Sequence, residues 1–454
     1  MKSLPLGEAR GRPRRGFPVG KITLLPLVAA TYFMVSGGPY GLEDVVQMSG
    51  YLGAILILIL TPLLWSVPTA LMVAELASAI PQEGGFYIWV RRGLGTFFGY
   101  QEVWLTLAGS IFEMALYPTL FVDYLGHFAP WLVAGHRAAA LGLAMIVICT
   151  LWNIRGARSV GMGALWMFVL LLGPFVILAT YGFSHRGAAS PAPTPLTHAD
   201  YLGGILVAMW NYMGWDNTST IAEEVERPQR TYPLAMLLSV ALVVISYVIP
   251  VAAAAYGGLA PSGWVTGGWV DVGRKLGGEW LAIALMIGGI ISAFGTFNAL
   301  MLSFSRLPLV MAEDGYLPKI FALRHPKSGA PWVAIAACAA AWAGCMFLGF
   351  ERLVILDVLL TGLSILLEFW ALTALRIREP SLSRPYRVPG GTLGTVLLGI
   401  PPLALMIVAV VRNHSESMGS VSALTVGLSL VAAGPMLYFL SRLVNRSARR
   451  PMQN

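Results

Sequence analysis

The sequence predicts an all-α polytopic membrane protein with about twelve membrane-spanning helices. Hydrophobic residues make up 57% of the 454-residue chain and charged residues only 11%, about half the charged share of a typical soluble domain. Apolar runs of about 20 residues, each long enough for a spanning helix, recur along the whole length. The strands of a membrane barrel would instead give short segments of alternating hydrophobicity.

The expected spans follow one another with short connections. They are 22–49, 51–80, 96–127, 138–154, 160–183, 201–226, 234–258, 281–308, 332–350, 353–375, 393–411 and 421–441. We divide the chain into a basic N-terminal tail, a first five-helix repeat, a second inverted five-helix repeat, two extra helices and a C-terminal tail: 1–21, 22–183, 201–376, 393–441 and 442–454. The longest outer connections are 184–199 and 259–280, and the loops are short, so there is no room for a large domain outside the membrane.

The net charge of +8 is distributed as in a membrane protein. If the N-terminus is cytoplasmic, 24 of the 30 Lys and Arg residues fall in cytoplasmic loops and tails. The six on the other side are Arg137, Arg186, Arg274, Lys275, Arg352 and Arg412. This asymmetry follows the positive-inside rule. We therefore expect a cell-membrane protein with both termini in the cytoplasm and with no nucleic-acid partner.

Two of the expected spans contain interruptions. The first breaks at 36–41, within VSGGPYGLED, and the sixth breaks at 211–216, in the middle of its span. The breaks are five spans apart, and an odd number inverts the topology, which is typical of an inverted repeat. Lipid cannot satisfy the backbone groups that a break exposes, so both breaks are expected to line a polar cavity near the bilayer midplane. The simpler alternative is that glycine and proline cause kinks here, as they commonly do in membrane helices.

Carboxylates at membrane depth are costly and mark candidate sites. Glu113 and Asp216 lie nearest the middle of their spans, and Asp216 has Trp210, Tyr212 and Trp215 beside it. A carboxylate next to aromatic rings suits a desolvated ammonium group, and a carboxylate at this depth can also hold a proton. We predict a substrate site formed by Ser36, Gly37, Gly38, Glu113, Trp210, Tyr212, Trp215 and Asp216, with Glu113 and Asp216 as candidates for proton coupling.

The other acids of the spans receive different predictions. Three nearer the cytoplasm are expected to be gate or helix-packing residues: Glu75, Glu102 and Glu368. Asp123 and Asp357 lie nearer the outer surface. Glu102 and Glu113 are eleven residues apart and share a helix face, and Asp357 and Glu368 repeat that spacing. For Glu113 and Asp216, the alternative is a carboxyl group that is neutral or hydrogen-bonded to Ser, Thr or backbone groups of a neighbouring helix.

Other chemistry is thinly represented in the sequence. No Walker loop is present, the six histidines have no metal-ligand spacing, and no nucleophile–base constellation is evident. The cysteines, Cys149, Cys338 and Cys345, lie inside apolar runs and are expected to be packing residues. The sequence therefore predicts neither an enzyme nor a protein with a cofactor or metal. A proton gradient is the expected energy source, with sodium as the open alternative.

Four segments resemble the amino acid–polyamine–organocation (APC) transporters. They are ELASAIPQEGGFYIWVRRGLG at 75–95, IAEEVERPQRTYPLAM at 221–236, SRLPLVMAEDGYLPKIFALRHPKSGAP at 305–331 and LRIREPSLSRPYRVPGG at 375–391. The resemblance implies a five-plus-five inverted-repeat fold with two further helices, and secondary transport by alternating access.

A narrower resemblance is to plant and protozoan polyamine uptake transporters. It is carried by VSGGPYGLED, by ALYPTLFVDYL at 115–125 and by NYMGWDNTSTIAEEVE at 211–226. In those transporters an acid at the position of Asp216, and another where Glu113 stands, belong to the substrate pathway. The resemblance implies a proton-coupled importer of cationic amines, with polyamines first.

The chain departs from typical amino-acid permeases of the same fold. These tend to carry a glycine break whose free amides bind the substrate carboxylate, but here Pro39 removes one N–H from the turn. The fifth span also lacks the interior lysine that some proton-coupled relatives use. A permease for cationic or neutral amino acids is the first alternative, and a transporter-like sensor or channel is a more remote one. The sequence indicates no stoichiometry or oligomeric state.

Overall fold

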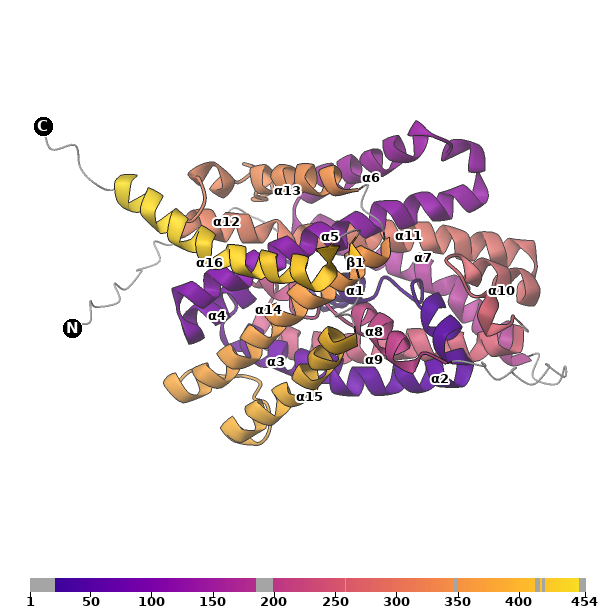
Figure 1. The fold of residues 1–454 in the computed structure, drawn as a ribbon, viewed down its shortest axis with the longest axis horizontal. Coiled ribbons are helices and arrows are strands. Elements are labelled where there is room, and N and C mark those ends of the chain that lie inside the picture. Colours follow the sequence, from indigo (N-terminus) through magenta and orange to yellow (C-terminus); the bar gives the residue numbers. More distant parts are fainter. Residues whose placement is uncertain are drawn as a thin grey trace, which may run out of the picture.

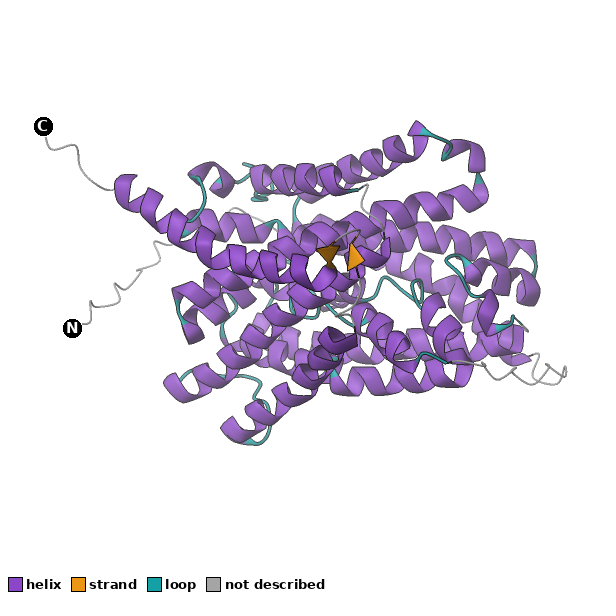
Figure 2. Ribbon diagram, viewed as in Figure 1, coloured by secondary structure: helices purple, strands orange, loops and turns teal. Residues whose placement is uncertain are grey.

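The computed structural model describes residues 21–184, 199–257, 259–346, 350–412, 417–418 and 421–448. These residues form a bundle of helices that run mostly along one direction (Figures 1 and 2). Within the described ranges, nine helical segments are long and apolar enough to cross a membrane, and three apolar helices are shorter: α1, α8 and α13. Together they account for the twelve predicted spans, so the predicted all-α polytopic fold is confirmed.

The α-helices are α1 (Leu24–Val35), α2 (Glu43–Leu64), α3 (Ser66–Ala79), α4 (Phe86–Leu94), α5 (Thr96–Phe128), α6 (His136–Ile154), α7 (Ala157–Ser184), α8 (Tyr201–Asn211), α9 (Pro228–Ala254), α10 (Gly268–Gly277), α11 (Glu279–Phe304), α12 (Arg306–Glu313), α13 (Trp332–Cys345), α14 (Phe350–Arg378), α15 (Gly391–Arg412) and α16 (Ala423–Ala448). Six 3₁₀ turns are η1 (Pro130–Leu132), η2 (Asn217–Thr220), η3 (Ala222–Glu224), η4 (Ala255–Gly257), η5 (Pro261–Gly263) and η6 (Lys319–Ala322). A pair of two-residue strands, β1 (Ser417–Met418) and β2 (Val421–Ser422), precedes α16.

Both predicted interruptions are present. The first span consists of α1 and of residues 43–49 of α2, because Gly50 is non-helical and separates that short segment from the next span. The sixth span differs from the expectation, since α8 is followed by the 3₁₀ turns η2 and η3 instead of a second α-helix. Side chains of η2 bond to their own backbone, as Thr220 Oγ1 does to the Asn217 carbonyl at 2.8 Å. Such local bonds compete with an α-helical ladder.

Three short helices were not predicted. Helix α4 lies within the 75–95 segment, α10 lies within the connection 259–280, and α12 lies within the 305–331 segment. Trp269 of α10 is fully buried, and its Nε1 donates to the carbonyl of Pro39 at 2.9 Å. Helix α10 therefore packs directly on the broken part of the first span, at the end of the bundle opposite α4 (Figure 1).

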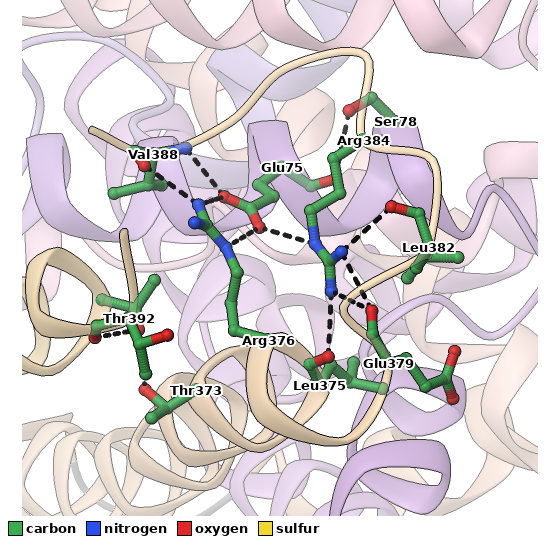
Figure 3. A network of polar contacts seen from close by, with 11 residues as sticks. Glu75, Ser78, Thr373, Leu375, Arg376, Glu379, Leu382, Arg384, Val388 and Thr392 are labelled. Atoms are coloured by element: carbon green, nitrogen blue, oxygen red, sulfur yellow. Dashed lines mark hydrogen bonds and ion pairs between the residues drawn. The ribbon is translucent and has the colours of Figure 1, made fainter. Parts of the chain in front are cut away.

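A buried ion-pair network ties the ends of α3 and α14 to the segment between α14 and α15 (Figure 3). Glu75 is fully buried and accepts from Arg376 Nε at 2.6 Å and from the Val388 amide at 2.7 Å. Arg384 Nε lies 3.2 Å from the same carboxylate. Glu75, which was predicted to be a gate or packing residue, thus holds three chain segments together through its carboxylate.

Further ion pairs lie at the same end of the bundle as α4 and α12. Glu83 pairs with Arg324 at 2.6 Å, and Arg306 of α12 pairs with Glu224 at 2.9 Å. We call this end, with these two pairs and the Glu75 network, the ion-paired end.

Backbone contacts reinforce the ion-paired end. The amide of Ile22, just before α1, donates to the Glu224 carbonyl at 2.8 Å, and the Gly84 amide donates to the Thr220 carbonyl at 2.9 Å. Gly85 has a φ of 38°, and a Cβ added there would overlap the backbone of Ser219. The ELASAIPQEGG turn is therefore packed against the segment that follows the second break, and it closes this end of the bundle.

Candidate functional site

A narrow cavity lies where the two interrupted spans meet. Its volume is about 40 Å³, which is room for a few water molecules but not for an alkyl chain. Helices α5, α11 and α14 complete the walls, with Thr106, Ser292 and Thr361 among the lining residues. A polar cavity at a pair of broken helices is what the sequence predicts for the midplane of the membrane.

The first break forms because glycine supplies backbone conformations that other residues avoid. Gly37, Gly38 and Gly41 have φ values of 62°, 96° and 92°. The amides at the end of α1 are already bonded within the chain. That of Gly37 donates to the Tyr32 carbonyl at 3.3 Å, and that of Gly38 donates to Ser36 Oγ at 2.9 Å.

Carbonyl groups of the first break are satisfied by neighbouring helices. The Gly37 carbonyl accepts from Ser292 Oγ of α11, and the Gly41 carbonyl accepts from Asn211 Nδ2 of α8 at 3.2 Å. The second break approaches equally closely, because a Cβ added at Gly214 would overlap the carbonyl of Met34. The two interruptions therefore support one another, and lipid is not needed to satisfy their backbone groups.

Three carboxylates line the cavity, each from a different part of the chain. Glu113 comes from α5, Asp216 from the second break and Asp357 from α14. Glu113 Oε1 accepts from the hydroxyl of Tyr117 at 3.2 Å, and Asp357 Oδ1 accepts from Thr361 Oγ1 at 3.0 Å. Each of these two carboxylates is thus oriented by a hydroxyl on its own helix.

Asp216 is the least satisfied of the three acids. It is 3% exposed, and its Oδ1 has no hydrogen-bond partner among the described residues. The described lining residues include neither lysine, arginine nor histidine. The cavity therefore concentrates negative charge at a place where burial makes such charge costly, and a cationic ligand would relieve that cost.

The predicted site residues divide into two groups. Ser36, Glu113, Trp210 and Asp216 line the cavity. The other four do not belong to its lining: Gly37, Gly38, Tyr212 and Trp215.

The residues outside the lining have other contacts. Tyr212 and Trp215 are fully buried, and the Tyr212 hydroxyl donates to the Leu58 carbonyl of α2 at 2.8 Å. Gly38 packs against the side chain of Leu171 on α7. Proximity in sequence to a break therefore did not place these side chains in the cavity.

Asp357 is the lining carboxylate that the sequence analysis did not select. It was expected nearer the outer surface, but α14 packs along α5 and brings it to the cavity with Glu113. The equal eleven-residue spacings of Glu102–Glu113 and Asp357–Glu368 were the available signal. Two neighbouring antiparallel helices with the same spacing place their acids at two matching levels.

Glu43, the first acid after the break, has a structural contact instead of an open position. It is 2% exposed, accepts from the Gly41 amide at 2.7 Å and accepts from the Tyr124 hydroxyl at 3.1 Å. It therefore stabilises the start of α2, where the N-terminus of a helix favours a carboxylate.

A polytopic helical bundle with a narrow cavity between two broken helices is typical of membrane transporters. Comparison with known proteins agrees with this class. The family described as "Amino acid permease" matches residues 28–429. The chain belongs to this family, within the APC superfamily, and is a transporter.

Several relatives match over most of the chain. The "Polyamine transporter RMV1" of Arabidopsis thaliana is 36% identical over 420 residues, which cover 91% of this chain and 85% of the relative. The "Polyamine transporter PUT1" of Oryza sativa subsp. japonica is 34% identical over 456 residues, covering 97% and 84%. An "Uncharacterized transporter" of Mycobacterium bovis is 30% identical over 278 residues, covering 58% and 59%.

Proposed function

We propose that this protein is a secondary active transporter that imports small cationic amines, polyamines before other amines, by alternating access. The observation that carries the proposal is the cavity lined by Glu113, Asp216 and Asp357 without a lysine, arginine or histidine among its described lining residues. The printed names of the Arabidopsis and rice relatives support polyamines as the substrate class.

The arrangement suits a substrate with more than one ammonium group. The three carboxylates come from separate elements, so in an open state of the cavity an elongated amine can pair with more than one of them. Trp210 supplies an aromatic face beside them, and such a face attracts a desolvated ammonium. Each charge-assisted contact contributes about 1.5 to 3 kcal/mol. A polyamine therefore gains more from this cavity than a monoamine does.

The backbone amides of the first break are already hydrogen-bonded within the chain. This disfavours the main alternative, an amino-acid permease. A substrate carboxylate needs unused donors at the first break, but the amides of Gly37 and Gly38 already donate to Tyr32 and Ser36. Pro39 provides no donor at all. Binding of an amino acid would require these bonds to break first.

A narrow cavity with both ends covered supports the proposed cycle, in which each end opens in turn. The ion-paired end is sealed by the Glu75 network and by Arg306–Glu224. The opposite end is covered by α10, through Trp269. The positive-inside rule supports the ion-paired end as cytoplasmic, with both termini on that side, and supports a location in the cell membrane. We propose a proton gradient as the energy source of import.

Uptake by purified protein in proteoliposomes tests the proposal. Radiolabelled putrescine and spermidine are expected to accumulate when the outside is acidic and to accumulate less without the gradient. Excess unlabelled spermine should compete, whereas lysine, arginine and leucine should not. Asp216→Asn should abolish most uptake, and Glu279→Gln is the matched control because Glu279 lies at an exposed position on α11, outside the cavity lining. Competition by amino acids but not by polyamines, or full uptake by Asp216→Asn, would refute the proposal.

A further inference from the structure

Two further acids of the spans lie outside the cavity. They form a second level along the helix axes, nearer the ion-paired end than the cavity acids. Glu102 of α5 and Glu368 of α14 are both fully buried. Each is eleven residues from a cavity acid on the same helix, about 16 Å along the axis. Both are displaced toward the ion-paired end, since α5 begins and α14 ends there (Figure 1). They therefore lie between the cavity and the sealed end of the transporter.

The oxygens of this acid pair are largely without partners. Neither oxygen of Glu368 and only one oxygen of Glu102 has a hydrogen-bond partner among the described residues. The one bonded oxygen, Oε1 of Glu102, accepts from Ser364 Oγ. Two ionised carboxylates in this position would each cost several kcal/mol, because no described residue places a cation beside them to compensate their desolvation. A buried polar atom without a partner requires an explanation.

Among the described residues, the charged groups around the pair offer no compensating cation. The charges that act on Glu368 are those of Asp216 and Glu102, and Asp216 also acts on Glu102. Arg376, two turns further along α14, is bound to Glu75. On α4, which packs against both helices, Arg91 pairs with Asp314 and Arg92 pairs with Glu379. On α16, the polar group is the uncharged hydroxyl of Tyr438, which lies 3.2 Å from Thr96 Oγ1.

Two hydroxyl groups lead from the cavity to Glu102, the one member of the pair that they reach. Thr106 of α5 lines the cavity, and its Oγ1 lies 3.0 Å from Ser364 Oγ of α14. Ser364 in turn donates to Glu102. A proton can follow such a chain, whereas an alkylammonium group cannot, because the carboxyl groups are fully buried and do not belong to the cavity lining.

We propose that Glu102 and Glu368 form the proton-binding site of the transport cycle, separate from the cavity acids that bind the amine. The proposal rests on the proposed function. One carboxyl group of the pair keeps its proton throughout the cycle, and a proton from the solution on the cavity side adds to the remaining carboxylate and gives a second neutral carboxyl group. The closed transporter then carries both groups without a buried charge. When the ion-paired end opens, water reaches the pair, the carboxylate is again hydrated and the proton leaves as H⁺ into that solution.

The test separates amine exchange from proton movement in Glu102→Gln and Glu368→Gln. Each substitution keeps the shape of a protonated carboxyl group but removes its titration. Counterflow of radiolabelled spermidine into spermidine-loaded proteoliposomes needs no gradient, and we expect it to stay within twofold of wild type. Spermidine-dependent proton influx, followed with a pH dye trapped inside, should fall at least tenfold. Glu279→Gln serves as the exposed control and should retain both.

Other outcomes would overturn the assignment. Proton influx at the wild-type level in both variants would show that the proton is bound elsewhere. Counterflow that falls for spermidine but not for putrescine would assign the pair to the substrate instead. Wild-type protein that exchanges spermidine without moving protons would overturn this inference and leave amine transport standing, whereas absent amine counterflow with intact proton-coupled amino-acid uptake would refute only the proposed substrate. If one variant does not fold, the other carries the test.

Discussion

Glu75→Gln is predicted to destabilise the transporter strongly. Glu75 is fully buried and binds Arg376, Arg384 and the Val388 amide (Figure 3). Glutamine has nearly the same shape but carries no charge, and one of its two terminal atoms is a donor. The substitution therefore leaves two guanidinium groups without their carboxylate, and it also places an N–H group against a donor of the network.

The size of the effect follows from the burial of the network. Removing one partner of a buried ion pair costs about 3 to 5 kcal/mol, because the remaining charge stays desolvated. The two arginines keep bonds to carbonyls, such as Arg376 to Val388 at 2.9 Å and Arg384 to Leu375 at 2.9 Å. These bonds hold the guanidinium groups in place, so they cannot reach solvent easily. We expect the upper part of that range.

The measurement is the Tm of detergent-purified protein. The Tm is read from the fraction of protein that remains monodisperse after heating. A loss of this size should lower the Tm by about 5 °C or more. Glu379→Gln is the matched control in the same region. Its carboxylate pairs with Arg92, both side chains are about one-third exposed, and exposed pairs contribute at most about 1 kcal/mol.

The contrast between the two variants decides the reasoning. If Glu75→Gln and Glu379→Gln lower the Tm equally, burial of the network does not control stability. A Glu75→Gln protein with wild-type Tm would refute the role of Glu75 in holding α3, α14 and the Val388 segment together.

Three further predictions concern other parts of the molecule. Asp357→Asn should raise the KM for spermidine uptake about tenfold or more, because one charge-assisted contact is lost, and an unchanged KM would exclude Asp357 from the amine site. Gly85→Ala should prevent accumulation of monodisperse protein, since the new Cβ overlaps the backbone of Ser219, whereas normal yield and Tm would contradict this packing. Asp200→Ala should cost about 0.5 to 2 kcal/mol, because Asp200 caps α8 through the Gly203 amide at 2.9 Å. That bond lowers the pKa of Asp200 below its ordinary value of 3.8, so the Tm difference from wild type should be full at neutral pH and should vanish as pH falls through the lowered pKa; a difference that persists in acid would refute the cap.

The broken helices could be predicted because their signal is local. Gly37, Gly38 and Gly41 stand inside an apolar run, and all three adopt positive φ values. Gly50, also with positive φ, separates the first two spans where the hydropathy pattern placed the boundary. The repeat boundaries drawn from the sequence stay a prediction, as do the cytoplasmic positions of the tails, and residues 1–20 and 185–198 lie outside the described ranges.

Features that depend on packing could not be read from one sequence. Helix α10 is only ten residues long and carries Arg274 and Lys275, so its composition is that of a loop, and its burial results from contact with α11 and the first break. The depth of Asp357 depends on how α14 lies against α5. Tyr212 turns toward α2 because its hydroxyl finds the Leu58 carbonyl. In each case a partner distant in sequence decides the position.

In the proposed cycle, the two levels of acids have different roles. The reason is that they differ in the space around the carboxyl groups and in their access to water. At the upper level, Asp216 and Asp357 line a cavity, so a cation that is larger than a proton can reach them once that cavity opens. At the lower level, Glu368 is enclosed by protein on all sides, and only a proton can neutralise it there. The first break offers little to a substrate carboxylate, because the Gly38 amide already donates to Ser36 Oγ. In the proposed cycle, the cavity acids, the buried acid pair outside the cavity and the occupied amides at the glycine break therefore all favour positive charge over a carboxylate.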